Sequence, residues 1–562
     1  MTAQLQPRRD PEIRLVLTLA TFTALSAFAF YFQHGCLLLY GDAVAHINIA
    51  RRVFDSRTPG LLQLGTVWLP LPHFLITPFI LSMSSWSTGL GGSVPSLAAY
   101  VAAVVGLFRL VRTSLASGPT LDARARLTAW LAAVIYAANP NLIYLQATAM
   151  TESLYLALFV WSVVFFADFV RALNTTAGSP ANTIARSLLK CGLCLAGAEL
   201  TRYDGWFAAV VMVTTAVLIV FRKNRHLGLK SLTVTLATLR LFILSAAAAP
   251  TIWLIYNAAI YRNPLEFAIG PYSARAIEQR NAVPGYPPHP GSHDLRAAAQ
   301  YFVKSAELSL AEGNTPKLWV FLAVAGVAVV LAHERRLAPF LLLWVPLPFY
   351  VLSVAYAGTP IFVPVWWPFS YYNVRYGIQL LPAVAIFVAL AFSFVARHAQ
   401  NRQLKLGLVL AALAFVAFSY AGVWRAQPVC FREAWANSRS RLALETQLAA
   451  NLRRLPANST LLMYLGDHVG ALQQAGIPLR RVINEGNHRT WRQPTDPEGL
   501  WERGLADPQS VADFAIGFGN DPVSQSAQRN HLQSILVVEA MGQPPATIYF
   551  ARVRSGVISQ VR

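Results

Sequence analysis

Apolar runs of about 20 residues recur along this chain, and they restrict its fold more than any other feature. The first run covers residues 13–33. It is long enough to cross a bilayer, because a membrane-spanning helix needs about 20 apolar residues. Only 13% of the 562 residues are charged, whereas soluble domains average about 25%. The sequence therefore predicts a polytopic membrane protein.

The connecting loops alternate between basic and non-basic composition, which predicts the orientation of the chain. Basic pairs such as Arg124 with Arg126 and Arg335 with Arg336 lie in every second loop. The positive-inside rule assigns these loops to the cytoplasm. The N-terminus is then inside, the C-terminus is outside, and the net charge of +20 reflects topology rather than nucleic-acid binding. We expect about eleven spans of this length, at roughly 13–33, 95–113, 126–140, 153–172, 186–200, 205–222, 238–260, 316–332, 338–356, 376–396 and 405–424.

Residues 67–84 are also apolar, but they contain Pro70, Pro72 and Pro78. Proline removes a backbone donor and kinks helices. Counting this segment as a span would also reverse the side of every later loop and violate the charge rule. We therefore expect interfacial or re-entrant helices here, within a first outer loop at 34–94.

The composition changes after residue 424. Residues 425–562 are polar and contain strand-like runs such as VADFAIGF and QSILVVE, with a helical pattern in HVGALQQAG. This alternation indicates a small α/β domain outside the membrane. The predicted fold is thus mostly α, with a membrane domain at 1–424 followed by this domain.

The first outer loop carries the first candidate catalytic group. Asp42 and His46 lie four residues apart and share one face if the segment is helical. A carboxylate at a wet surface can accept a proton from an acceptor hydroxyl, although Asp42 is also suited to cap a helix. Arg51 and His73 follow in the same loop. With His46 they are candidate substrate-binding residues. A purely interfacial position is the alternative for His73.

Three more charges lie at the expected outer ends of later spans. Glu152 is a second catalytic candidate, because carboxylates at a membrane rim are often functional. Arg202, in TRYDGW, and Arg375 are candidates for binding a lipid-linked phosphate, because guanidinium forks match phosphate oxygens. The alternatives are a helix-capping role for Glu152, an ion pair of Arg202 with Asp204 or Glu199, and a snorkelling Arg375.

Aromatic residues gather in the loop before the span at 376–396. They are typical of an interfacial belt, and Tyr372 is also placed to stack on a sugar or polyprenyl chain. The loop contains Trp366, Trp367, Tyr371 and Tyr372.

The sequence leaves metal binding open. Asp42, His46, His73 and Glu152 include ligand types that divalent cations use. No spacing resembles a dedicated metal site, so a cation bridging a carboxylate and a phosphate is one alternative among others.

Together these motifs resemble the GT-C membrane glycosyltransferases, in particular the group of protein O-mannosyltransferases and lipid A aminoarabinose transferases. The matching elements are the acidic residue of the first outer loop, Asp42 in YGDAVAH, the triplet MTE ending at Glu152, and the basic residue followed by Gly, Arg202 in TRYDGW. A proline-rich element also matches, but here it reads LPLPHFL, with His73 after the prolines instead of before them.

The resemblance implies an inverting enzyme with a polyprenyl-phosphate-linked sugar donor. It implies that Arg202 and Arg375 hold the donor phosphate and that Asp42 deprotonates the hydroxyl of a protein, lipid or glycan acceptor. The composition, rich in Arg and Ala, is compatible with a bacterial source, so we expect the cell inner membrane, with the site facing the periplasm or exterior. A transporter or flippase of lipid-linked sugars and a non-catalytic scaffold are the competing functions. Mostly apolar span interiors, with polar groups at one rim, favour the enzyme.

Overall fold

The computed structural model describes residues 10–116, 122–174, 181–224, 229–281, 284–285, 288–466, 468–488 and 499–552. These residues form two compact units. The helical unit comprises Met1–Tyr31, Pro95–Ala147 and Thr151–Glu433. The mixed unit comprises Phe32–Val94, Thr148–Met150 and Ala434–Arg562. The mixed unit therefore combines the first outer loop, which we expected within the membrane domain, with most of the C-terminal segment.

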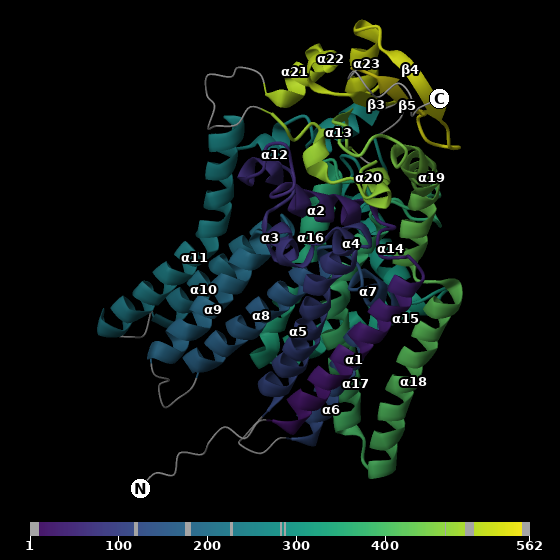
Figure 1. Cartoon of the computed structure of the whole chain (residues 1–562). Helices are drawn as coiled ribbons and strands as arrows, with labels where there is room; N and C mark the ends of the chain where they lie inside the picture. The colour runs from purple at the N-terminus through teal and green to yellow at the C-terminus, as the bar shows by residue number, and fades with distance from the viewer. Residues whose placement is uncertain are drawn as a thin grey trace. The chain divides into compact units, whose positions relative to one another are not determined.

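Long apolar helices dominate the helical unit. Helix α8 packs against α9, and α9 packs against α10 and α11 (Figure 1). The helices are α1 (Pro11–Gln33), α5 (Leu90–Leu115), α6 (Ala123–Ala137), α7 (Pro140–Leu145), α8 (Glu152–Asn174), α9 (Ala181–Glu199), α10 (Asp204–Asn224), α11 (Leu229–Tyr261), α12 (Glu266–Ile269), α13 (Ala274–Asn281), α14 (Leu295–Leu310), α15 (Thr315–Ala332), η3 (Arg335–Trp344), α16 (Pro346–Tyr356), η4 (Val374–Leu380), α17 (Leu381–His398) and α18 (Arg402–Ala426). Helix α19 (Val429–Leu452) begins in this unit and continues into the mixed unit.

Nine helical segments in the described part of the chain are long and apolar enough to cross a membrane. Each coincides with one of the predicted spans, which confirms the mostly helical membrane architecture. The other two predicted spans form α6 and α9. Helix α6 has only 15 residues, and α9 carries Arg186, Lys190 and Glu199, so neither is counted among the nine.

Ion pairs join the helix ends that carry the basic loop residues. Arg112 lies 3.3 Å from Glu12, and Arg126 lies 2.8 Å from the same carboxylate. Arg124 lies 3.0 Å from Glu334. These contacts link α1, α5 and α6 at the ends that the charge rule predicts to be cytoplasmic.

A five-stranded sheet organises the C-terminal part of the mixed unit and confirms the predicted α/β domain. Strand β1 is parallel to β2 and β3, and β5 is antiparallel to β3 and β4. Leu462, Ile483, Trp501 and Val523 form its core. The strands, in the order β2-β1-β3-β5-β4, are β1 (Leu461–Met463), β2 (Val482–Ile483), β3 (Phe514–Phe518), β4 (Gln533–Val538) and β5 (Ala546–Phe550).

The rest of the mixed unit consists of most of α19 and of short helices. The proline-containing segment forms α3, η2 and part of α4, none longer than six residues. At 1.5 Å per residue, such helices span about 9 Å, which is too short to cross a bilayer. Their interfacial position remains a prediction. The bounds are α2 (Gly41–Arg52), η1 (Leu61–Leu64), α3 (Leu71–Ile76), η2 (Thr77–Phe79), α4 (Met83–Ser87), α20 (Gly470–Ala475), η5 (Leu479–Arg481), α21 (Leu500–Ala506), α22 (Pro508–Val511) and α23 (Pro522–Arg529).

Candidate active site

A buried carboxylate joins two of the predicted phosphate-binding arginines within the helical unit. Glu152 is the first residue of α8, and its side chain is fully buried. Its Oε1 lies 3.3 Å from Nη1 of Arg202 and 3.2 Å from Nε of Arg375. Glu152, Arg202, Asp204, Arg375 and Glu433, with the rings of Tyr350 and Tyr376, are called the arginine cluster below.

Other polar groups fix the orientation of Arg202. Its Nη2 donates to the Tyr350 hydroxyl at 2.8 Å, and its Nη1 donates to the Thr151 hydroxyl at 3.1 Å. Its Nε lies 3.4 Å from Asp204, which also accepts from the Tyr350 hydroxyl at 2.9 Å. Arg202 therefore forms the predicted ion pair with Asp204. Its second carboxylate partner is Glu152 rather than Glu199.

Arg375 has its own carboxylate partner at the start of α19. Its backbone N–H donates to Glu433 Oε2 at 3.2 Å, and its Nη1 donates to Oε1 at 3.4 Å. The Tyr376 ring centroid lies 5.1 Å from the guanidinium carbon of Arg375 and 5.1 Å from that of Arg202. One aromatic ring thus attracts both cations. Arg375 is not a snorkelling surface arginine, because only 8% of its side chain is exposed.

The cluster holds three carboxylates and two guanidinium groups. Glu152 Oε2 and Asp204 Oδ1 are buried without a hydrogen-bond partner among the described residues. Buried polar atoms of this kind are normally satisfied by water or a ligand. The arrangement can therefore present two oriented arginines to an anion. Glu152 Oε2 and Asp204 Oδ1 can also accept hydrogen bonds from a ligand or water.

Asp42 lies in the mixed unit, as the second residue of α2, and is half-buried. Tyr40 occupies the N-cap position, and no side-chain capping bond is formed there. Asp42 is therefore not the N-cap residue. His46 follows four residues later in the same helix, so the two side chains lie on one side of α2.

His46 and His73 form a buried pair. Nδ1 of His46 lies 3.0 Å from Nε2 of His73. The Trp68 ring packs against His46, with 4.5 Å between the two ring centroids. Burial lowers the pKa of His73 well below its usual value, and charges on His46 and Arg52 lower it further. His73 is therefore neutral near pH 7, with one histidine of the pair donating and the other accepting.

Arg51 is occupied by contacts within the mixed unit. Its Nε donates to Asp55 at 2.8 Å, and its Nη1 donates to the carbonyl oxygens of Ile80 and Leu81 at 2.7 and 2.8 Å. Only 5% of the residue is exposed. These contacts join α2 to the end of the proline-containing segment, which favours a structural role for Arg51 over the predicted contact with substrate.

Tyr372 lies in the aromatic loop of the helical unit. Its backbone pairs with that of Phe362 through hydrogen bonds of 2.9 and 3.2 Å, and 45% of the residue is exposed. Trp367 and Phe369 are also exposed. This exposure is consistent with both an interfacial belt and a stacking surface.

The described side chains form no recognisable metal-binding site. Across the part of the chain that the structure describes, no group of three or more His, Cys, Asp or Glu side chains is arranged to hold a metal ion. The divalent cation remains a prediction.

Sequence reasoning missed three members of the arginine cluster: Tyr350, Tyr376 and Glu433. Tyr350 lies inside a predicted span, where an aromatic residue is ordinary. Glu433 follows the last span in a polar stretch. The only available signal was Tyr376, which directly follows a candidate arginine.

No protein-family model matches the chain, and no curated protein matches it in sequence. Solved structures do match it in fold. The structure of ArnT from Cupriavidus metallidurans bound to undecaprenyl phosphate matches with a TM-score of 0.57 and 12% identity, over 94% of this chain and 97% of that one. The same protein in the apo state matches with a TM-score of 0.54 and 12% identity, over 93% and 98% of the two chains.

A third structure is that of the Archaeoglobus fulgidus oligosaccharyltransferase tethered to an acceptor peptide. It matches with a TM-score of 0.50 and 10% identity, over 94% of this chain and 69% of that one. ArnT is an aminoarabinose transferase, and both proteins are GT-C glycosyltransferases. The resemblance inferred from the sequence motifs is thereby confirmed at the level of the fold: this chain has the GT-C membrane glycosyltransferase fold.

Proposed function

We propose that the protein is a membrane glycosyltransferase that moves a sugar from a polyprenyl-phosphate-linked donor to an acceptor hydroxyl. The observation that carries the proposal is the match over nearly the whole of both chains to ArnT bound to undecaprenyl phosphate. The arginine cluster supports it, because Arg202 and Arg375 lie together there and guanidinium donors match phosphate oxygens.

Arg202 and Arg375 are the proposed phosphate ligands. Their guanidinium groups are held in place by Glu152 and the Tyr376 ring before any ligand arrives. Preorganised donors stabilise the charge that develops on a leaving phosphate without first having to reorient. Glu152 is the proposed positioning residue for the two arginines, and its direct catalytic role stays a prediction.

Asp42 is the proposed general base. It takes the proton of the acceptor hydroxyl while the hydroxyl oxygen bonds to the anomeric carbon of the sugar. The bond between that carbon and the phosphate oxygen breaks, and polyprenyl phosphate leaves with both electrons. A single displacement of this kind inverts the anomeric configuration. His46 lies four residues after Asp42 on α2, and its contact with His73 of α3 supports that side of the helix.

The proposed location is the cell inner membrane, with the mixed unit on the outer side. The sugar is a hexose or pentose, and the acceptor is a protein, lipid or glycan. A divalent cation remains a proposed cofactor, to be tested by adding a chelator to the transfer assay.

Transfer in proteoliposomes tests the proposal. Purified protein is given radiolabelled hexosyl and pentosyl polyprenyl phosphates together with envelope extracts as acceptors. We expect label in the acceptor fraction with the wild-type protein, and none with Asp42→Asn, which should still bind polyprenyl phosphate. Movement of the lipid-linked sugar across the bilayer without transfer would instead identify a flippase.

A further inference from the structure

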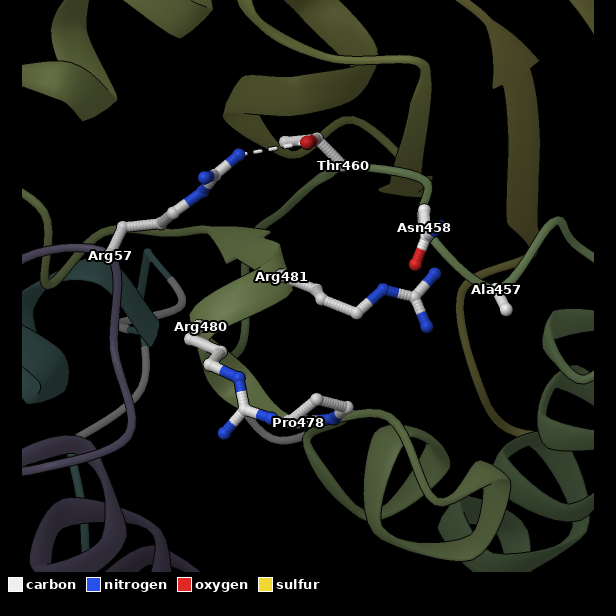
Figure 2. A pocket seen from close by; sticks show the side chains of 7 residues that line it. All are labelled: Arg57, Ala457, Asn458, Thr460, Pro478, Arg480 and Arg481. Carbon is white, nitrogen blue, oxygen red and sulfur yellow. Dashed lines mark hydrogen bonds between the residues drawn. The ribbon is translucent and has the colours of Figure 1, made fainter.

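A basic pocket in the mixed unit has no role in the reaction proposed above. Its volume is about 370 Å³, and it is lined by polar and charged side chains from three separate segments (Figure 2). Those used here are Arg57, Asn458, Thr460, Arg480 and Arg481.

The sheet explains why these residues meet. Strands β1 and β2 are parallel, with Leu461 opposite Val482, so the segments that lead into both strands lie at the same edge of the sheet. Thr460 directly precedes β1, and Arg481 directly precedes β2. Arg57 comes from the loop after α2, and its Nη2 donates to the Thr460 hydroxyl at 2.8 Å.

Neutral groups hold two of the three arginines. Arg57 contacts a hydroxyl. The Nε and Nη2 of Arg481 donate to the carbonyl oxygens of Ser459 and Pro456 at 3.0 and 3.1 Å. Figure 2 shows the Arg481 side chain directed toward Asn458. Carbonyl and hydroxyl partners fix these guanidinium groups without cancelling their charge.

The nearby carboxylates are engaged elsewhere. Asp55 accepts from Arg51 at 2.8 Å, and it lies 3.7 Å from Arg480, whose side chain is 68% exposed. Asp513 accepts the backbone N–H of Thr460 at 2.8 Å. Three arginines that are permanently charged therefore face two carboxylates that already have other partners, and the pocket keeps a positive balance.

We propose that this pocket binds the phosphate or carboxylate group of an anionic sugar on the acceptor glycan. Guanidinium groups pair with both kinds of anion in a forked geometry. The hydroxyl of Thr460 and the amide of Asn458 add hydrogen-bonding groups suited to sugar hydroxyls. The volume lies within the range of about 300–1,000 Å³ that small-molecule pockets occupy. The assignment of the sugar to the acceptor depends on the transferase function proposed above.

Binding of glucose 1-phosphate to the full-length protein in neutral phosphatidylcholine nanodiscs tests this proposal. By calorimetry, we expect glucose 1-phosphate to bind saturably to the wild-type protein. We expect no binding of glucose, which lacks the anionic group. The double variant Arg57→Gln/Arg480→Gln should raise the Kd at least tenfold. Both side chains are exposed, so the unit should still fold, as size-exclusion chromatography would verify. The matched control is Arg529→Gln, an exposed arginine on α23, which should leave the Kd unchanged.

Three outcomes would overturn the proposal. They are no saturable binding by the wild-type protein, equal binding by the double variant, and an equal loss in Arg529→Gln, which would indicate non-specific charge attraction. A titration with inorganic phosphate distinguishes a sugar-linked phosphate from free phosphate as the ligand. We expect it to bind at least tenfold more weakly than glucose 1-phosphate, and equal affinity would overturn the assignment to a sugar.

The assay measures binding and needs no turnover, so its failure is distinct from failure of the proposed transferase. If the protein transfers no sugar but binds glucose 1-phosphate through Arg57 and Arg480, the transferase function is refuted and the anion-binding role of the pocket is supported. A protein that transfers sugar without this binding would refute only the pocket.

Discussion

Nε of Arg375 lies 3.2 Å from Oε1 of Glu152, and the same oxygen also contacts Arg202 at 3.3 Å. A single buried carboxylate therefore sets the separation of the two guanidinium groups. Positioning of this kind is as important for phosphate binding as the charges themselves, because two guanidinium groups that are already oriented can bind one phosphate without first having to move.

Glu152→Gln is expected to destabilise the helical unit. The substitution removes the contacts of one charged oxygen with both arginines, and a hydrogen bond to a charged group contributes about 1.5–3 kcal/mol. Asp204 and Glu433 still pair with Arg202 and Arg375. Glu307→Gln is the matched control, because Glu307 pairs with Lys304 and both side chains are partly exposed; it should cost about 0–1 kcal/mol. Thermal unfolding of both variants in one detergent measures the difference. Equal midpoints would show that Glu152 does not hold the arginines.

Tyr376 allows a test of the aromatic contact. Tyr376→Phe keeps the ring face near both guanidinium groups, and Tyr376→Leu removes it. The Leu variant should weaken polyprenyl phosphate binding by about 1–2 kcal/mol, since desolvated cation–π contacts reach that range. The Phe variant should bind almost normally. Native mass spectrometry of lipid-bound protein gives the ratio, and an equal loss in both variants would assign the effect to the hydroxyl group instead.

His73 predicts a dependence of stability on pH. Its pKa in the folded protein lies well below the usual value of about 6.5, because the ring is buried. As the pH falls below about 6.5, the unfolded chain binds a proton that the folded chain refuses, so the free energy of unfolding falls by about 1.4 kcal/mol per pH unit.

The check is unfolding of the mixed unit between pH 7 and pH 5. His73→Gln should flatten the pH dependence, while His531→Gln, at an exposed position, should not. Identical slopes in the wild-type protein and His73→Gln would show that His73 does not govern this pH dependence.

Labelling of introduced cysteines tests the predicted orientation. Met541 is 96% exposed in the mixed unit, and Arg335 is exposed in a basic loop of the helical unit. A membrane-impermeant maleimide added to intact cells should label Met541→Cys and leave Arg335→Cys unlabelled until the cells are permeabilised. The reverse pattern would overturn the assignment of sides.

Hydropathy and charge order predicted the helices well, because crossing a bilayer requires runs of fixed length and composition. The strands β3 and β4 were predicted for a similar reason, since each is a distinct apolar run. Strand β2 was missed, because its two residues are too few to show a pattern. Its pairing with β1 depends on contacts that the local sequence does not encode.

Side-chain roles were harder to predict than positions. The sequence named Arg202 and Arg375 as candidates, and their role stays a prediction. It could not show that Glu152 contacts both of them, because the three residues are far apart in the chain. Arg51 shows a similar limit. Its place beside Asp42 and His46 suggested a contact with substrate, but the sequence could not show that its Nε and Nη1 donate to Asp55 and two backbone carbonyls.

A density map of the purified protein with bound undecaprenyl phosphate tests the central claim most directly. The account predicts phosphate density within hydrogen-bonding distance of Arg202 or Arg375, with the lipid tail running along apolar helices. Phosphate density remote from both arginines, or a lipid threading a cavity open to both sides of the membrane, would contradict it.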